Sequence, residues 1–420
     1  MIVSFPSTNE ARTGRVLFYI QHLYGIGHLK RAAAIAAAMA RIGLDVTVAH
    51  GGMPVAGMEW PGVDLVQLPA AAIRGGDFSQ LVDEAGRDVD EAWRVRRASA
   101  LADLADRVRP DAVLFELFPF GRRQFRFELL ALIERLRERS PRPAILSSVR
   151  DILVASPKPG REREAADLVL AAFDEVLVHG DPAFVPFETS FGEAARIAGK
   201  LRYTGYVSSD LRALDPASGA QADDDDPTAP GAGEIVVSAG GGAAGGPLWR
   251  HLLEARRLGR AHALPWRLIA GPRLPAQAYA DLEAAAAKAA SVAGSGPIAV
   301  ERFRSDFPAV LRRAALSISQ GGYNTTIDLL ATGVPAIVVP IGEAEETEQT
   351  ERAARLAERF YIRLFPEERL SDPAAFAAEI DAALADAPRR RAMPAAEFAL
   401  KGAETSAAIL AEHVRRVRGG

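Results

Sequence analysis

The sequence predicts an α/β protein built from two Rossmann-like βαβ halves. Short β-branched runs alternate with longer segments of helical periodicity, which is the pattern of βα units around a parallel sheet. The 420 residues exceed the ~250–300 that one hydrophobic core usually organises, so two domains are expected. Residues 215–233 are rich in Asp, Pro, Gly and Ala without apolar periodicity, and they predict a linker between two series of βα units.

The first half contains six candidate strands and a helix that directly follows the first strand. Apolar residues recur at helical spacing between Leu29 and Ile42, at Leu29, Ala32, Ile35, Ala36 and Met39. The predicted strands are Val16 to Ile20, Asp45 to Ala49, Asp64 to Leu68, Ala112 to Phe115, Ala144 to Ser148 and Glu175 to His179.

The second half repeats this architecture and ends in a helix from about Pro394 to Val417. We therefore expect an N-terminal domain over residues 1–214, the linker 215–233, a C-terminal domain over 234–393 and a closing helical segment, 394–420. The predicted strands are Ile235 to Ser238, Arg267 to Ala270, Ile298 to Val300, Leu316 to Ser319 and Ala336 to Val339.

Composition excludes several classes of protein. A formal charge of −4 lacks the basic footprint of a duplex-binding protein, so no nucleic-acid partner is expected. The absence of cysteine excludes disulfides, thiolate catalysis and Cys-ligated zinc. The N-terminus has too short an apolar run for a signal peptide, and no stretch approaches the ~20 apolar residues of a membrane span, so a cytoplasmic location is expected.

The sequence does not support three familiar motifs: an Asp-x-Asp metal site, a dinucleotide-binding fingerprint and a Gly-Lys-Ser/Thr phosphate loop. The acidic run Asp223 to Asp226 resembles an Asp-x-Asp metal site, but a solvated linker explains it better. The turn from Gly25 to Lys30 lacks the third glycine of the dinucleotide fingerprint, and no Gly-Lys-Ser/Thr phosphate loop occurs. Neither a metal nor another cofactor is therefore expected.

The strongest local signal is the run Ser319-Gln320-Gly321-Gly322-Tyr323-Asn324-Thr325-Thr326-Ile327-Asp328, which leaves an apolar strand and enters a helix. Glycines let a ligand approach the backbone, and a helix N-terminus offers free N–H groups and a positive dipole to an anion. Asn324 and Thr325 are also ordinary N-cap residues, so this pattern predicts either a phosphate site or a capped helix.

Carboxylates near this run add groups that suit a sugar. Asp328 falls one turn after Asn324 and can present its carboxylate to a diol from the same helix face. After the next strand, an acidic loop places Glu348 and Gln349 at the expected carboxyl edge of the sheet, where open α/β folds bind ligands. The alternative for Glu348 is a solvated acidic surface.

The run from Gln320 to Asp328 resembles the donor-binding box of the UDP-dependent glycosyltransferases, and the stretch to Leu356 is similar to the MurG-like, family 28-like enzymes. The resemblance implies the two-domain GT-B fold and a UDP-sugar donor. It implies that Gly321 to Thr325 hold the diphosphate, that Asp328 binds the ribose, and that Glu348 and Gln349 face the sugar. Gln320 replaces the histidine of the plant and animal enzymes; it can donate a hydrogen bond but carries no charge.

Two further segments fit the same family pattern. Gly240, Gly241 and Gly242 follow the first strand of the second half, where their amides can line a diphosphate pocket; a simple tight turn is the alternative. Phe303 and Arg304 follow another strand, at the place where similar enzymes hold the nucleobase through the main chain.

The first half supplies the expected catalytic pair, His28 and Glu116. His28 lies between strand and helix, at a position that MurG-like enzymes and their sugar-nucleotide hydrolase relatives fill with Gly and His; a locally packed histidine is the alternative. A neutral imidazole there can take a proton from a hydroxyl. Glu116 and Asp151 follow neighbouring strands as candidates for orienting it, and Lys30 and Arg31 are either site residues or exposed helix.

The resemblance implies an inverting, metal-independent transfer of a sugar to an unidentified acceptor, lipid-linked or small. The segment Phe118 to Arg142 interleaves phenylalanines with arginines, as in an acceptor or peripheral membrane patch, although its stripe of Leu129, Ile133 and Leu136 favours a core-facing helix. A sugar-nucleotide hydrolase or epimerase on the same fold and a non-catalytic nucleotide-sugar-binding protein remain alternatives.

Overall fold

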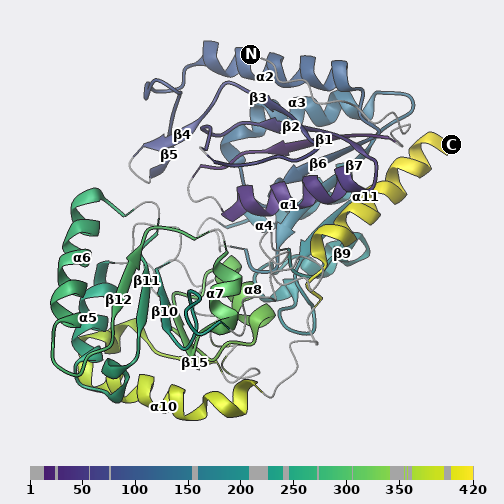
Figure 1. The fold of residues 1–420 in the computed structure, drawn as a ribbon. Helices are drawn as coiled ribbons and strands as arrows, with labels where there is room; N and C mark the ends of the chain where they lie inside the picture. Colours follow the sequence, from purple (N-terminus) through teal and green to yellow (C-terminus); the bar gives the residue numbers. More distant parts are fainter. Residues whose placement is uncertain are drawn as a thin grey trace. The chain divides into compact units, whose positions relative to one another are not determined.

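Two parallel sheets organise the chain (Figure 1). The computed structural model describes residues 14–23, 27–55, 57–74, 77–153, 159–207, 226–239, 246–271, 274–304, 306–340, 354, 357, 362–391 and 399–419. Contacts divide the chain into two compact units. Unit 1 comprises Met1–Pro182, Pro186–Val207 and Lys401–Gly420, and unit 2 comprises Ala183–Val185 and Ser208–Leu400.

Unit 1 holds, within its described residues, a seven-stranded sheet in which every neighbouring pair is parallel. The order is β3-β2-β1-β6-β7-β8-β9, so it reverses between β1 and β6. Such a reversal opens a crevice at the carboxyl ends of the strands, where α/β folds bind ligands. The strands are β1 (Arg15–Ile20), β2 (Asp45–His50), β3 (Asp64–Gln67), β6 (Ala112–Glu116), β7 (Ala144–Arg150), β8 (Glu175–His179) and β9 (Leu201–Tyr203).

Side chains of this sheet alternate between two cores. In β1, Leu17 and Tyr19 belong to the core with α2, α3 and α4, whereas Val16, Phe18 and Ile20 belong to the core with α1 and α11. Because both faces are buried, the strand is a continuous apolar run rather than an alternating one. The helices are α1 (Gly27–Arg41), α2 (Glu91–Val108), α3 (Arg126–Arg137), α4 (Arg161–Ala172) and α11 (Gly402–Gly419).

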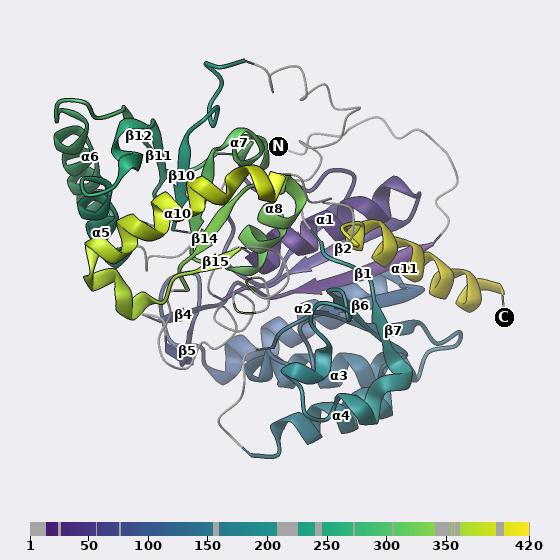
Figure 2. The same ribbon diagram turned by 90° about the horizontal axis from the view of Figure 1, so that it is seen from below.

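The helix predicted after the first strand is confirmed as α1. Its expected apolar face, Leu29, Ala32, Ile35, Ala36 and Met39, is at most 1% exposed. Helix α11 packs beside α1, although the two lie at opposite ends of the sequence (Figure 2).

The start of α11 is set by a backbone contact within unit 1. The Gly402 N–H donates to the Tyr206 carbonyl at 2.9 Å. A Cβ on Gly402 would lie 2.4 Å from the Gly205 carbonyl oxygen, so only glycine fits. The prediction of a helix from Pro394 is wrong for residues 399–401, which are not helical; residues 392–398 lie outside the described residues.

Unit 2 repeats the strand order of unit 1 in a parallel sheet that has six strands among its described residues, β12-β11-β10-β13-β14-β15. The order again reverses, between β10 and β13. The predicted fold class is therefore confirmed. The elements are β10 (Ile235–Ser238), α5 (Gly246–Arg256), β11 (Trp266–Ile269), α6 (Ala276–Ala290), β12 (Ile298–Glu301), α7 (Phe307–Arg313), β13 (Leu316–Ser319), α8 (Tyr323–Thr332), β14 (Ala336–Val338), β15 (Arg363–Leu364) and α10 (Pro373–Arg391).

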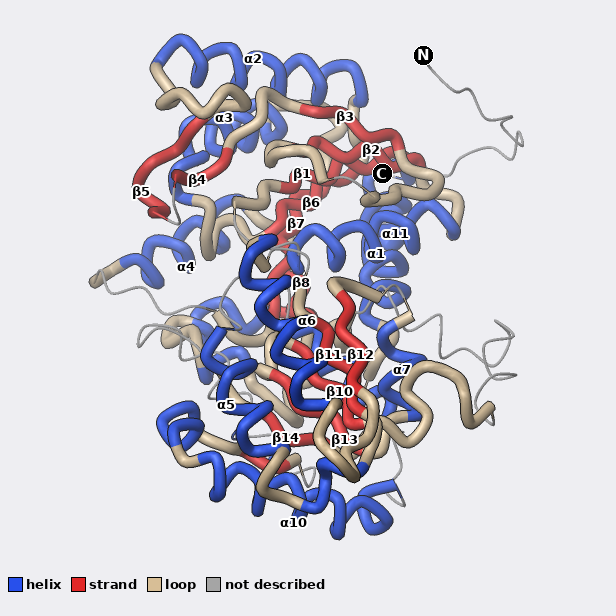
Figure 3. The backbone as a smooth tube through the Cα atoms, turned by 60° about the vertical axis from the view of Figure 1, so that its left-hand side comes forward, coloured by secondary structure: helices blue, strands red, loops and turns tan. Residues whose placement is uncertain are grey.

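The main core of unit 2 lies on one face of this sheet. Val237 and Ile318 pack there with side chains of α5, α6 and α10 (Figure 3). Alternation along the strands turns the neighbouring Ser238 and Ser319 to the opposite face. Polar side chains are thereby concentrated on one side of the carboxyl edge.

Every strand predicted from the sequence overlaps an observed one, but four of the observed strands were missed among the described residues. Strands β4 (Ala72–Arg74) and β5 (Asp77–Val82) form an antiparallel pair in a stretch where no strand was predicted. Strands β9 and β15 were also missed. Strands β4, β9 and β15 have at most three residues, which is too short to show a periodicity, and the six residues of β5 do not alternate strictly between apolar and polar.

Candidate functional site

The first candidate site lies at the carboxyl edge of the unit 1 sheet, where the strand order reverses. His28 is in the first turn of α1, which follows β1, and Glu116 is the last residue of the neighbouring β6. His28 Nδ1 lies 2.9 Å from Glu116 Oε1. The structure thus brings together the two residues of the expected catalytic pair. The preceding Gly25 and Ile26 lie outside the described residues.

The Glu116 carboxylate is buried and fully engaged. Arg31, one helical turn after His28, forms an ion pair with Oε1 and is itself buried, which answers the question that the sequence left open. The second oxygen, Oε2, accepts a hydrogen bond from the Ser148 hydroxyl at 2.8 Å. Three side chains from two elements, α1 and β7, therefore fix the orientation of this carboxylate.

The charges around Glu116 decide where the protons lie. Burial by itself would raise the pKa of Glu116, but Arg31 and the hydrogen bond with His28 outweigh it and hold that pKa below its usual range. Glu116 is therefore ionised and only accepts, so His28 carries its proton on Nδ1. Arg31 Nη2 also lies 3.0 Å from Nδ1, but this nitrogen of Arg31 already donates to Glu116 Oε1, so the assignment rests on the contact of Nδ1 with the ionised carboxylate. It leaves His28 Nε2 as a proton acceptor, as a general base requires.

His28 is neutral in this environment. Burial lowers its pKa to about 3; the hydrogen bond to Glu116 opposes the shift, and the charges of Arg31, Arg150 and Arg122 add to it. An anion bound beside these arginines would offset their charge and raise the proton affinity of the imidazole. The imidazole of His28 is thus unprotonated, and its basicity would rise if an anionic group bound nearby.

The network continues through residues that sequence reasoning missed. Ser148 donates to Glu116, so its oxygen accepts from His179 Nε2 at 2.8 Å, and His179 Nδ1 lies 2.8 Å from Thr204 Oγ1. Burial, with a smaller contribution from Arg31, lowers the pKa of His179 to about 3, so this ring is also neutral. Polar residues at the ends of apolar strands are the signal that marks Ser148 and His179.

Asp151 has different contacts. Its Oδ2 accepts from the Tyr206 hydroxyl at 3.0 Å, and its Oδ1 accepts from the Ile152 N–H at 2.9 Å. A Cβ on Gly180 would lie 2.5 Å from the Asp151 Cβ, so the carboxylate sits against the backbone after β8. These contacts give Asp151 a part in holding together the segments that follow β7 and β8.

The second candidate site lies at the carboxyl edge of the unit 2 sheet. After β13 the chain passes through Gln320, Gly321 and Gly322 into α8, as predicted. Gly321 has a φ of 73°, and a Cβ there would lie 2.5 Å from Val338 Cγ1. The turn therefore requires glycine and brings the backbone close to β14.

Helix α8 starts without a side-chain cap in the described structure. Gly322 is the N-cap residue, and Asn324 and Thr325 lie inside the first turn. The capped-helix interpretation of these two residues is thus not supported. The N–H groups of a first turn have no intrahelical acceptor, so this end of α8 offers donors and a positive dipole to an anion.

Three buried polar atoms at this edge have no hydrogen-bond partner within the described part of the chain. They are Ser238 Oγ, Ser319 Oγ and Gln320 Nε2. Ser238 and Ser319 are partners in register on neighbouring strands, so their hydroxyls share one face of the sheet. Buried polar groups are nearly always satisfied, and a bound ligand or water is the usual explanation for exceptions. The sequence indicated Gln320 and included Ser319 at the start of the same motif, but it did not indicate Ser238.

Asp328 lies on α8, one turn after Asn324, and is 5% exposed. Its position near the start of α8 is the one expected from the sequence. The remaining donor-site candidates lie outside the described residues, namely Gly240, Gly241, Gly242, Glu348 and Gln349.

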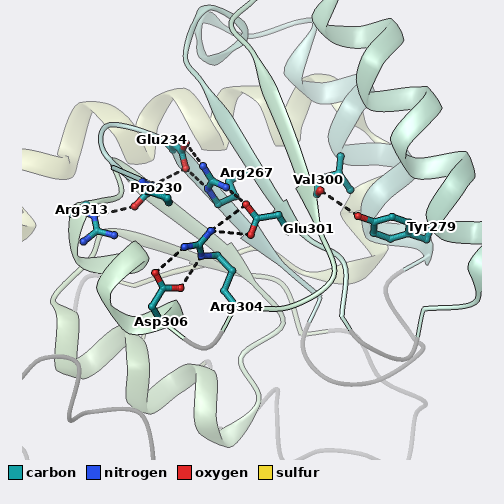
Figure 4. A network of polar contacts seen from close by, with 10 residues as sticks. Pro230, Glu234, Arg267, Tyr279, Val300, Glu301, Arg304, Asp306 and Arg313 are labelled. Carbon is teal, nitrogen blue, oxygen red and sulfur yellow. Dashed lines mark hydrogen bonds and ion pairs between the residues drawn. The ribbon is translucent and has the colours of Figure 1, made fainter. Parts of the chain in front are cut away.

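A chain of ion pairs crosses the unit 2 sheet and fixes the loop after β12 (Figure 4). Arg267 of β11 pairs with Glu234 before β10 and with Glu301 at the end of β12. Arg304 pairs in turn with Glu301 at 3.1 Å and with Asp306 at 2.8 Å. The hydrogen bonds to Asp306 and Glu301 hold the pKa of Arg304 above its usual value.

Because of these ion pairs, the side chains of Phe303 and Arg304 differ in their availability to a ligand. The Arg304 guanidinium is occupied by two carboxylates, whereas the Phe303 side chain is 52% exposed. A ligand at this loop would meet a rigid backbone rather than an available arginine. That geometry is compatible with contact through the main chain.

Comparisons with known proteins agree with this geometry. Residues 277–409 match the model of the glycosyltransferase family 28 C-terminal domain. The whole chain is similar in structure to MurG of Acinetobacter baumannii, with a TM-score of 0.57 and 15% identity over 96% of this chain and 99% of that one. The chain carries a GT-B glycosyltransferase fold.

Other proteins share this GT-B fold. The glycosyltransferase VinC in complex with dTDP superposes with a TM-score of 0.58 and 15% identity, covering 97% of this chain and 100% of that one. The UDP-GlcNAc 2-epimerase of Neisseria meningitidis bound to UDP-GlcNAc gives 0.56 and 11%, covering 96% and 100%. The family match and the fold together support a glycosyltransferase and the MurG-like, family 28-like resemblance of the run from Gln320 to Asp328.

Among the residues that the structure describes, no helix is both long enough and apolar enough to cross a bilayer.

Proposed function

We propose that this GT-B protein transfers a sugar from a UDP-sugar to an acceptor hydroxyl, with inversion at the anomeric carbon and without a metal ion. The observation that carries the proposal is the pairing of His28 Nδ1 with the buried Glu116 carboxylate. Packing alone does not require a buried, ionised carboxylate beside a neutral histidine. General-base chemistry requires the neutral imidazole, and the carboxylate can orient that imidazole and stabilise the imidazolium that forms.

The reaction would proceed in one displacement. The acceptor oxygen bonds to the anomeric carbon while its proton passes to His28 Nε2. The bond between that carbon and the diphosphate oxygen breaks, and its electron pair leaves with the diphosphate. Glu116 stabilises the imidazolium that forms. Attack opposite the leaving group inverts the anomeric centre.

The donor would bind at the carboxyl edge of unit 2. The unpartnered Ser238, Ser319 and Gln320 groups and the first-turn N–H groups of α8 would hold the diphosphate, and they supply the stabilisation that a metal supplies in other enzymes. Asp328 would bind the ribose and the backbone of Phe303 and Arg304 the base. For Gly240, Gly241, Gly242, Glu348 and Gln349 the sequence-based assignment to the diphosphate and the sugar remains our prediction.

Two measurements test the proposal. In calorimetry with excess chelator, UDP should bind with unchanged affinity; loss of binding on chelation would overturn the metal-free mechanism, and preference for another nucleotide would overturn the base assignment. Donor turnover should then depend on an acceptor, for which a cell extract is the source. Turnover to free sugar or to an epimer in buffer alone would favour the hydrolase or epimerase, whose fold this chain also shares.

A further inference from the structure

Many side chains of the arginine- and phenylalanine-rich segment Phe118 to Arg142 form ion pairs or core contacts within unit 1. Arg135 and Arg139 pair with Asp106 of α2, and Arg142 pairs with Asp174. These pairs tie elements together and leave little free charge for a membrane surface.

The aromatic residues of this segment are divided in the same way. Phe118 and Phe125 are fully buried in the core, as are the stripe residues Leu129, Ile133 and Leu136 that the sequence indicated as core-facing. Phe127, in contrast, is only partly buried. It lies beside a cavity.

The cavity has a volume of about 560 Å³ and lies wholly within unit 1. It is bounded by β5 of the hairpin, the start of α2, the short helix Arg123–Phe125 and the start of α3. The apolar residues of its lining include Leu81, Val89 and Phe127. The cationic residues are Arg94, Arg123 and Arg126.

The charges of the lining do not balance. Arg123 and Arg126 share one carboxylate, Glu164, each at 2.6 Å. The Arg94 guanidinium lies 5.6 Å from the centre of the Phe127 ring, and no ion pair holds it among the described residues. The acidic residue Asp88 of the lining pairs with Arg74 at 3.0 Å. Positive charge therefore exceeds negative charge beside a partly buried aromatic ring. Such a site favours an anion joined to a flat apolar group.

One backbone segment contributes residues both to the His28 site and to the lining of the cavity. The loop after Glu116 leads directly into Arg123, and it is fixed by hydrogen bonds from the Leu117 N–H to Ser148 and from the Gly121 N–H to Leu117, at 2.8 and 2.7 Å. The residue that would orient the base and a residue that lines the cavity thus belong to one short, anchored segment.

We propose that this cavity binds the acceptor, and that the acceptor carries a phosphate or carboxylate next to a planar apolar part. The identification of the bound molecule as the acceptor depends on the proposed function. The inference of an anion site depends only on the cavity and its arginines.

Saturation-transfer NMR with phenyl phosphate, benzoate and neutral benzyl alcohol tests the site without donor. The two anions should bind and benzyl alcohol should bind at least about tenfold more weakly, because hydrogen bonds to charged groups are the stronger ones. Arg94→Gln should weaken phenyl phosphate binding about tenfold, whereas Arg94→Lys should retain part of it. Asp88→Asn should strengthen it, since Asp88 is a carboxylate of the lining.

Arg135→Gln is the matched control, because Arg135 lies on α3 but pairs with Asp106 outside the lining. Equal binding of benzyl alcohol, or an Arg135→Gln loss as large as that of Arg94→Gln, would overturn the anion site. Calorimetry with UDP separates this result from the proposed function. UDP binding with no phenyl phosphate binding defeats the cavity proposal alone; phenyl phosphate binding without UDP binding or donor turnover defeats the transferase and the acceptor assignment.

Discussion

The two units share a strand order but differ in the hydrogen bonding of the buried serine hydroxyls at their carboxyl edges. In unit 1, Glu116, Ser148 and His179 satisfy one another's hydrogen bonds. In unit 2, the hydroxyls of Ser238 and Ser319 have no partner among the described residues. A closed network holds one arrangement of protons, whereas an open set of donors suits a ligand that supplies the acceptors. Under the proposed function, one fold would provide preorganised proton chemistry in one unit and a binding surface in the other.

The sharpest way to break this comparison is to remove the base. His28→Ala should reduce turnover by ~10²–10⁴-fold, the usual contribution of a general base, and leave UDP affinity unchanged because the donor groups belong to unit 2. Paired kinetics and calorimetry measure the two effects. Arg41→Ala, at the other end of α1 in an exposed ion pair with Glu404, is the control. A folded His28→Ala protein with wild-type turnover would show that this histidine is not the base.

The next effect concerns the binding surface. Asp328→Ala should weaken UDP binding at least ~10-fold, because hydrogen bonds to a charged group contribute ~1.5–3 kcal/mol. Turnover at saturating donor should fall less than affinity. Calorimetry and circular dichroism would separate a lost contact from lost structure. Unchanged affinity in a folded variant would return Asp328 to a structural role.

Two serines at equivalent depth test the contrast directly. Ser148→Ala should destabilise the protein by ~1–3 kcal/mol, because it removes the hydrogen bonds that Glu116 Oε2 and His179 Nε2 make with the Ser148 hydroxyl. Ser319→Ala removes an unpartnered hydroxyl, so the ligand-free protein should be unchanged or about 1 kcal/mol more stable, while UDP binding weakens. Thermal unfolding with and without UDP measures both. Equal destabilisation by the two changes would erase the distinction between the units.

The last expected effect is a pH dependence that arises from two histidines of unit 1. His28 and His179 have folded pKa values of about 3, below the ordinary 6.5. Between these values the unfolded chain binds protons that the folded unit does not. Stability is therefore complete above about pH 6.5 and falls as the pH approaches 3. Hydrogen exchange should show β6 and β7 losing protection on acidification before β10 and β13. His179→Gln should reduce this difference, and equal loss of protection in both sheets would count against it.

The sequence by itself determined the local helices and strands and the strand ends at which the candidate site residues lie. Buried strands show β-branched runs, α1 shows its apolar stripe, and the glycines before α8 show the turn, because each pattern repeats within a few residues. His28, Glu116 and Gln320 could be singled out for the same reason: each is a polar residue at the end of a βα unit. The resemblance of the run from Gln320 to Asp328 added the donor site.

Only the tertiary structure decided which of these residues meet. The order β1-β6-β7-β8 places Ser148 and His179 beside Glu116, buries Arg31 against it, and aligns Ser238 with Ser319 across a strand pair. None of these contacts leaves a periodic trace, because strand order joins segments that are far apart in the chain. Burial then sets the protonation of His28, since an imidazole loses its affinity for a proton only when neighbouring elements exclude water and bring other charges to it.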